Sequence, residues 1–296
     1  MNRATVSLQS SRQILHLLVA VFFSVGLIWA AGEGRLEKTF DTTREPRISL
    51  INLKGHVLVR GWDKAQVHVV YTVASPRVEV DSEIFPDTGA GDKLHFDTHL
   101  LDATLPASEQ GVDYALDVPA GATLEIRNPQ GKIVMEGMHA DASVQSVGGD
   151  ITIRDYSGHL SVHSVGGNIE IIRPAGNVEA YTITGNLHFV SPNTTSLHGS
   201  TTSGHILYEG DFMVRGDYVL SAYSGDVDIV CPPSASYELR AKTLKGKVSN
   251  TLPMTRRREP ASPRGAANSL LGTYNTGKAN VELTSFSGSI RIRPQY

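Results

Sequence analysis

The sequence is poor in several residue types, and each scarcity excludes a class of protein. One cysteine in 296 residues excludes an internal disulfide framework and a cysteine-based zinc site. The 27 basic residues do not exceed the 30 acidic ones, which argues against nucleic acid as a partner. Neither a P-loop nor a Rossmann glycine fingerprint is present, so we expect no nucleotide cofactor and no other cofactor. Glycine, with 28 residues, is abundant, as is typical of a chain with many turns.

The first 32 residues have the pattern of an export signal. A serine-rich leader with Arg3 and Arg12 precedes the uncharged stretch Ile14–Ala30, which ends in small residues. A basic start, an apolar centre and a small-residue end predict a cleaved secretory signal peptide. The uncharged span 13–32 is just long enough to cross a bilayer, so an uncleaved membrane anchor is the alternative. In either case we expect residues 33–296 to be exported to the periplasm, the cell envelope or the extracellular space.

A repeat dominates the second half of the chain. Its glycines recur at intervals of 18, 18, 18, 19, 21, 21 and 42 residues, at Gly131, Gly149, Gly167, Gly185, Gly204, Gly225, Gly246 and Gly288. Around them stand similar segments, such as SVGGDITI, SVGGNIEI and SFSGSIRI, with apolar residues two and four positions after the glycine. This period-two alternation predicts a strand with one buried face. The fold predicted is therefore all-β, a single-stranded β-helix-like solenoid of 18–21-residue coils.

A second strand is predicted before each glycine. Apolar residues recur seven, five and two positions before it, as Ala142, Val144 and Val147 do in one repeat. We expect all three columns to face inward, and intervening residues such as Gln145 to face solvent. The glycine between the two strands, here Gly149, indicates a bend that needs a positive φ.

Residues 33–127 repeat less regularly but have the composition of strands. The motif N-x-x-G-H-V-L-V-R-G at Asn52–Gly61 returns as N-x-x-G-K-I-V-M-E-G at Asn128–Gly137, so the first segment is expected to carry a related coil or hairpin. The apolar segment Val67–Val73 predicts a buried strand. We interpret this region as an irregular β cap on a solenoid of residues 128–296, because an open-ended stack needs a cap.

Three motifs together resemble a known family. They are G-H-V-x-V-x-G-W-D from Gly55, Y-x-L-D-V-P-A-G-A-x-L-E-I-x-N-x-x-G from Tyr114, and the tandem S-x-G-D-I-x-I coils. They resemble the bacterial putative-adhesin family, a group of envelope proteins with a domain of unknown function. The resemblance covers roughly residues 40–294. It implies a solenoid at the cell envelope and, by analogy, a role in adhesion. The family has no established catalytic residues that could be assigned to positions of this sequence.

Stacked coils place outward side chains in columns, where candidate sites must lie. The column directly after the glycines is expected to complete the turns through side-chain to backbone hydrogen bonds, and it holds Asp150, Asn168, Asn186, His205, Asp226, Lys247 and Ser289. Two columns further on, Glu170 and His188 fall on neighbouring coils; Glu179 and His198 match in the same way on the other strand. A Glu–His pair is a weak metal candidate without a third ligand, so we expect exposed pair contacts and no metal.

Catalysis has two weak candidates. Asp226 and Asp228 lie two residues apart on one strand, a separation that suits a glycosidase pair, and several β-helix proteins are polysaccharide lyases or glycosidases. However, Lys247 on the next coil should neutralise Asp226, and the only tryptophan after the export segment is Trp62. Cys231 lacks an in-phase histidine and is expected to be a small core or edge residue. We therefore expect no catalysis and keep a carbohydrate-active enzyme as the alternative.

A basic insertion at 254–276 interrupts the glycine spacing. Its arginines are Arg256, Arg257, Arg258 and Arg264. They could bind an anionic envelope polymer, lipid headgroups or another envelope protein, and a mobile solvated loop is the plainer alternative.

Taken together, the patterns predict a non-catalytic, exported envelope protein with an adhesin-like binding or scaffold surface. A carbohydrate-active enzyme is one alternative. The other is a structural envelope protein that self-associates end to end or along an exposed edge strand.

Overall fold

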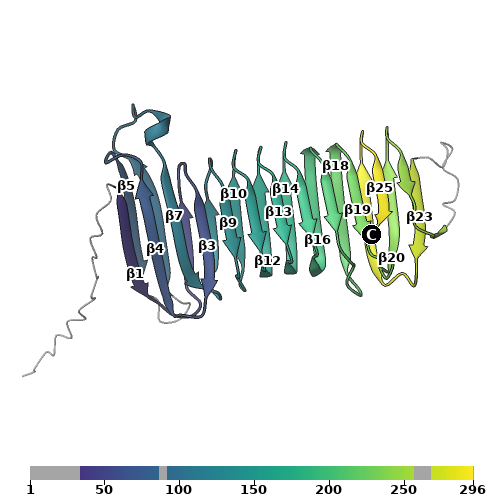
Figure 1. The fold of residues 1–296 in the computed structure, drawn as a ribbon, viewed down its shortest axis with the longest axis horizontal. Coiled ribbons are helices and arrows are strands. Elements are labelled where there is room, and N and C mark those ends of the chain that lie inside the picture. Colours follow the sequence, from purple (N-terminus) through teal and green to yellow (C-terminus); the bar gives the residue numbers. More distant parts are fainter. Residues whose placement is uncertain (1–33, 87–91, 257–267, 296) are drawn as a thin grey trace, which may run out of the picture.

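The computed structural model describes residues 34–86, 92–256 and 268–295, which form one elongated stack of strands (Figure 1). Two sheets run along the stack, one of 12 strands and one of 13. Within the described ranges, the helical structure is limited to the short 3-10 turn η1 (Ala107–Glu109). The predicted export segment, residues 1–32, lies outside the described residues.

The order of strands in space defines the two sheets. The 12-stranded sheet contains β1 (Arg35–Asp41), β4 (Gln66–Val73), β7 (Val112–Pro119), β3 (Val57–Trp62), β9 (Ile133–Glu136), β11 (Ile151–Arg154), β13 (Ile169–Ile172), β15 (Leu187–Val190), β17 (Ile206–Glu209), β19 (Val227–Cys231), β25 (Ile290–Pro294) and β21 (Val248–Asn250). The 13-stranded sheet contains β22 (Thr255–Arg256), β23 (Ser269–Tyr274), β20 (Tyr237–Thr243), β24 (Ala279–Ser285), β18 (Asp217–Ser224), β16 (Asn193–Ser203), β14 (Ala175–Thr182), β12 (Ser157–Ser164), β10 (Ala142–Ser146), β8 (Thr123–Arg127), β2 (Arg47–Ile51), β6 (Lys93–Leu100) and β5 (Val78–Phe85).

Each coil contributes one strand to each sheet, and neighbouring coils pair in parallel. Ile151 pairs with Ile169 in one sheet, and Val144 pairs with Val162 in the other, so the register equals the 18-residue repeat. Aligned repeats bring equivalent residues side by side, which lets each coil cover the apolar face that its neighbour cannot bury alone. The predicted all-β solenoid is confirmed.

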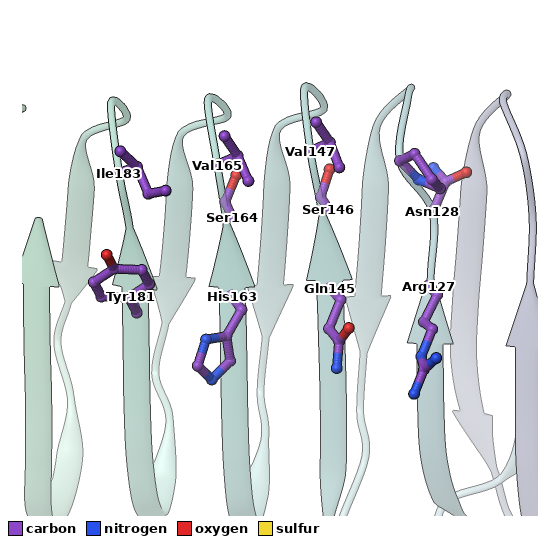
Figure 2. Close-up of a pocket in the computed structure, with 11 residues that line it drawn as sticks. Arg127, Asn128, Gln145, Ser146, Val147, His163, Ser164, Val165, Tyr181 and Ile183 are labelled. Carbon is purple, nitrogen blue, oxygen red and sulfur yellow. The ribbon is translucent and has the colours of Figure 1, made fainter. Parts of the chain in front are cut away.

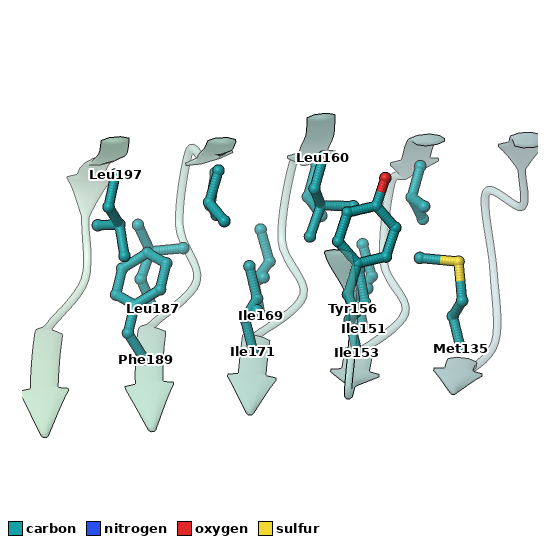
Figure 3. Close-up of a cluster of buried hydrophobic side chains, with 14 of the residues drawn as sticks. Met135, Ile151, Ile153, Tyr156, Leu160, Ile169, Ile171, Leu187, Phe189 and Leu197 are labelled. Carbon is teal, nitrogen blue, oxygen red and sulfur yellow. The ribbon is translucent and has the colours of Figure 1, made fainter. Parts of the chain in front are cut away.

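The core lies between the two sheets and is built from the alternating apolar positions. Ile169 and Ile171 are buried on one side, and Leu160 is buried on the other (Figure 3). Burying each such side chain contributes about 1.5–3 kcal/mol, so the repeated columns stabilise the stack along its whole length. Cys231 is also buried in this core, as expected.

Antiparallel strands lie at one end of both sheets and at the other end of the 13-stranded sheet. At one end β4 pairs with β1 and β7, and β5 pairs with β6; at the other, β23 pairs with β20 and β22. The first motif forms a coil rather than a hairpin, because β2 and β3 pair in parallel with β8 and β9. Such strands break the parallel ladder and so cap the repetitive part of the fold.

The coils do not stack entirely in chain order. The last coil, β24 and β25, is inserted between the coil of β18 and β19 and the coil of β20 and β21. Near the other end, β2 and β3 are likewise inserted between β6 and β7 on one side and β8 and β9 on the other. The expected contact of Asp226 with Lys247 is therefore wrong, because Ser289 of the last coil lies beside Asp226.

The column two residues before each turn glycine faces outward, contrary to prediction. Val147, Val165 and Ile183 are 51%, 43% and 37% exposed. Strand alternation continues instead to the residue three before the glycine, such as Ser164, which is 3% exposed. Its hydroxyl accepts a hydrogen bond of 3.0 Å from the N–H of Gly167, so a polar residue fills the narrow interior of the turn.

The repeat glycines are required for close approach rather than for a positive φ. A β-carbon on Gly167 would lie 1.9 Å from the carbonyl oxygen of Gly149, and the contact recurs along the stack. Among the repeat glycines only Gly131 has a positive φ. Left-handed residues occur at the opposite turns instead, where Asp155 and Arg173 have φ of 51° and 49°.

Candidate functional site

A shallow groove of about 390 Å³ follows the turn edge of the 13-stranded sheet (Figure 2). It lies across β8, β10, β12 and β14 and the turns that follow them. Its lining residues are Arg127, Asn128, Pro129, Gln145, Ser146, Val147, His163, Ser164, Val165, Tyr181 and Ile183.

Two parallel rows of outward-facing side chains line the groove. The apolar row holds Pro129, Val147, Val165 and Ile183. The polar row holds Arg127, Gln145, His163 and Tyr181, which are paired in register from strand to strand. Neighbouring members of a row are separated by the distance between strands, about 4.8 Å. Figure 2 shows both rows repeating from coil to coil.

Backbone hydrogen bonds between coils fix the turns that carry the apolar row. The N–H of Val147 donates to the carbonyl of Pro129 over 3.2 Å, and the N–H of Gly166 donates to that of Val147 over 2.8 Å. Because the hydroxyls of Ser146 and Ser164 also accept from turn glycines, the rows are held by several bonds per coil. A ligand would therefore meet a surface that is already ordered.

Both rows extend beyond the groove along the rest of the stack, with the apolar row interrupted at Thr202. The polar row continues in register through Ser200, Ser221, Thr284 and Lys242. In the apolar row the rings of Tyr223 and Phe286 stack with centroids 4.7 Å apart. The result is a stripe with one apolar side and one polar side that follows the long axis.

Asp226 and Asp228 lie on the outer face of the other sheet and are tied to arginine. The guanidinium of Arg291 donates to Asp228 over 2.6 Å and lies 2.8 Å from Asp226. Hydrogen bonding to Asp228 raises the pKa of Arg291. The Asp228 side chain is 8% exposed, and His205 and Arg293 lie 3.5 and 3.6 Å from it. This geometry anchors the inserted strand β25 rather than presenting two carboxylates to a cleft.

Glu170 and His188 are neighbours on β13 and β15, as predicted, with Oε1 and Nδ1 3.6 Å apart. A second acid completes the contact, because Nε2 of His188 lies 3.0 Å from Glu209. Glu179 and His198 are also paired in register. Over the residues that the structure describes, no three His, Cys, Asp or Glu side chains are arranged to hold a metal ion.

The column after the glycines forms a ladder between coils rather than completing its own turns. The N–H of Asn168 donates to Asp150 over 2.9 Å, and the N–H of Asn186 donates to Asn168 over 3.0 Å. The same bond recurs from His205 to Asn186. These bonds stabilise the stacking of the coils.

The basic insertion is only partly described. Arg256 belongs to the short strand β22, while Arg257, Arg258 and Arg264 lie outside the described residues. Binding by these arginines stays a prediction.

The groove was missed at the sequence level. The sequence feature that indicates the groove is the apolar residue two positions before each glycine. This residue does not fall on the same side of the strand's two-residue alternation as the buried residues before it. Parity, rather than hydrophobicity alone, identifies this column as exposed.

The fold and the groove define the class of protein. It is an open two-sheet β-solenoid that carries an apolar row and a polar row of side chains on one sheet. The chain belongs to the Toastrack DUF4097 family, which it matches over residues 97–293, and this confirms the resemblance to the putative-adhesin family. A crystal structure of a putative cell adhesion protein from Clostridium sporogenes is similar over 88% of this chain and 100% of that one, with 10% identity and a TM-score of 0.30. A putative adhesin from Bacteroides fragilis is similar over 89% and 98%, with 8% identity and a TM-score of 0.27.

No curated protein matches the sequence. The part of the chain that the structure describes contains no helix long and apolar enough to span a membrane.

Proposed function

We propose that this protein is an exported envelope protein that acts as a non-catalytic, adhesin-like binding or scaffold surface. The observation that supports this proposal best is the two-row stripe on the 13-stranded sheet. Exposed apolar residues such as Val147 and Val165 recur there at the same turn position of neighbouring coils. Large contiguous apolar patches on soluble proteins commonly mark sites of interaction.

Two other features favour the same proposal. The leader and the apolar stretch 14–30 are typical of an exported protein. The carboxylates that would be needed for glycosidase chemistry, Asp226 and Asp228, are engaged by Arg291. A glycosidase that used this pair would need at least one of the two carboxylates available to a sugar.

Binding of residues 33–296 to isolated cell-envelope fractions tests the proposal. We expect binding without release of shortened polymer products. A variant with Arg256, Arg257, Arg258 and Arg264 replaced by Ser separates the two candidate surfaces. Salt-sensitive binding that this variant loses would assign the contact to the basic insertion. Absence of binding by both proteins would contradict the proposal, and polymer cleavage that Asp226→Asn with Asp228→Asn abolishes would establish the enzyme instead.

Self-association is the second candidate function, because the exposed apolar row could pack against a second copy of itself. In that case sedimentation should show assembly that increases with protein concentration, and Val165→Asp should abolish it. Monomers at every concentration would contradict this candidate.

A further inference from the structure

We propose that the stripe binds a linear polysaccharide whose chain runs along the stack, crossing successive strands. This inference rests on the proposed binding function and names the class of ligand. It assigns the contact to the polar row of Gln145, His163 and Tyr181 and to the apolar row beside it.

The repeat distance favours a sugar chain over a peptide. Equivalent side chains recur once per coil, about 4.8 Å apart, which is comparable with the advance of one pyranose ring in an extended polysaccharide. An extended peptide advances about 3.3 Å per residue, and its side chains return to the same face only every second residue. A peptide therefore loses register with the coils within a few strands, whereas each sugar in turn can meet one member of each row.

The chemistry of the two rows matches the two kinds of surface on a sugar. Val147, Val165 and Ile183 offer an apolar strip for the C–H faces of the rings. The polar row offers an amide, an imidazole and a phenol, which can donate and accept hydrogen bonds with hydroxyl groups. The rings of His163 and Tyr181 lie 6.0 Å apart on adjacent strands, so neighbouring sugars would meet neighbouring rings.

The charge of the groove argues against a lipid headgroup as the ligand, and Lys242, the cation in the rest of the polar row, lies on β20 toward the far end of the stack. Arg127 at one end of the groove is already paired with Glu125 over 2.7 Å, and the next three members of its row carry no permanent charge. Binding through uncharged hydrogen bonds and apolar contacts is weakly screened by salt. Salt dependence thus separates this site from the basic insertion, where salt should reduce binding strongly.

Calorimetric titration with soluble polysaccharide, released from isolated envelopes and separated by length, tests the inference. We expect affinity to rise with chain length until the stripe is filled and to change less than twofold across a salt series. Tyr181→Ala and Val165→Asp should each weaken binding at least fivefold. Glu170→Gln, on the outer face of the opposite sheet, is the matched control and should bind as the wild type does. Circular dichroism confirms that each variant is folded.

The outcomes distinguish this inference from the proposed function. Whole envelope fractions are titrated in parallel. Envelope binding that Tyr181→Ala and Val165→Asp leave intact would overturn the stripe assignment but preserve the binding function. Binding to anionic phospholipid vesicles in place of the polysaccharide would also overturn it. If the wild type binds neither envelopes nor released polysaccharide, both proposals fail.

Discussion

The turn glycines show how much one missing side chain matters in a stacked fold. A β-carbon added to Gly167 would lie 1.9 Å from a backbone carbonyl oxygen. A β-carbon added to the adjacent Gly166 would lie 3.4 Å from its nearest atom. We predict that Gly167→Ala lowers the free energy of unfolding by about 3 kcal/mol or more, because two coils must separate. Gly166→Ala should change it by less than about 1 kcal/mol. Denaturant unfolding of both variants measures the difference, and equal effects would contradict the close-approach account.

The buried cysteine makes the free energy of unfolding depend on pH in the alkaline range. Burial raises the pKa of the Cys231 thiol from 9.0 to about 11. Between these two values the unfolded chain loses this proton while the folded chain keeps it, so stability falls as pH rises from 9 to 11. Below pH 9 the contribution is fully present.

The prediction is that Cys231→Ala loses stability less steeply over this pH range than the wild type. Buried tyrosines that do not contact the thiol, such as Tyr156, whose pKa is also raised by burial, contribute the same background to both proteins. Urea unfolding at a series of pH values gives the two slopes. Equal slopes would show that the thiol does not titrate as described.

Single-residue features were predictable where the strand pattern is local. The buried residues Val144 and Val162 and the exposed Gln145 follow from alternation alone. The hydrophobicity of Val147 predicts a buried position, whereas the parity of the strand places it on the exposed face. The role of Ser146 in the turn depends on a hydrogen bond to a glycine N–H, which composition does not reveal.

At the scale of elements, the ion pairs around β25 hold the inserted coil. Arg291 binds the nearly buried Asp228 and the neighbouring Asp226, both in the coil before the insertion. We predict that Arg291→Met lowers stability by about 2–3 kcal/mol, because Asp228 then keeps only its longer contacts with His205 and Arg293.

Arg240 provides a matched control on the opposite sheet. It lies 3.8 Å from Glu282 and its side chain is 71% exposed, so Arg240→Met should cost less than about 1 kcal/mol. Thermal or denaturant unfolding compares the two variants. An equal loss from both would mean that the contact around Asp228 is no stronger than a surface ion pair.

The strands and their register were predictable from the repeat, but the order of the coils was not. Every coil presents a similar apolar interior, so sequence spacing alone does not select its neighbour. The last coil lies between the coils of Gly225 and Gly246, because the segment between Gly246 and Gly288 is long enough for the chain to return. The groove was not predictable from hydrophobicity, because its apolar row, which includes Val147 and Val165, lies on the exposed side of the strand alternation.

At the scale of the whole molecule, both inserted coils place terminal segments inside the stack. We predict that amide hydrogens of β25 exchange as slowly as those of interior coils such as β15, because β25 is paired on both sides. The edge strand β21 should exchange faster. Hydrogen exchange followed by mass spectrometry makes this comparison, and β25 exchanging first would indicate coils stacked in chain order.

The most direct test of the binding surface is hydrogen exchange of residues 33–296 with and without polysaccharide released from the envelope. The account predicts slower exchange in the bound state at the turns that follow β10, β12 and β14, which carry Val147, Val165 and Ile183. Exchange over the outer face of the 12-stranded sheet should be unchanged. Protection confined to that opposite face, or to the basic insertion, would contradict the assignment of the stripe as the binding surface.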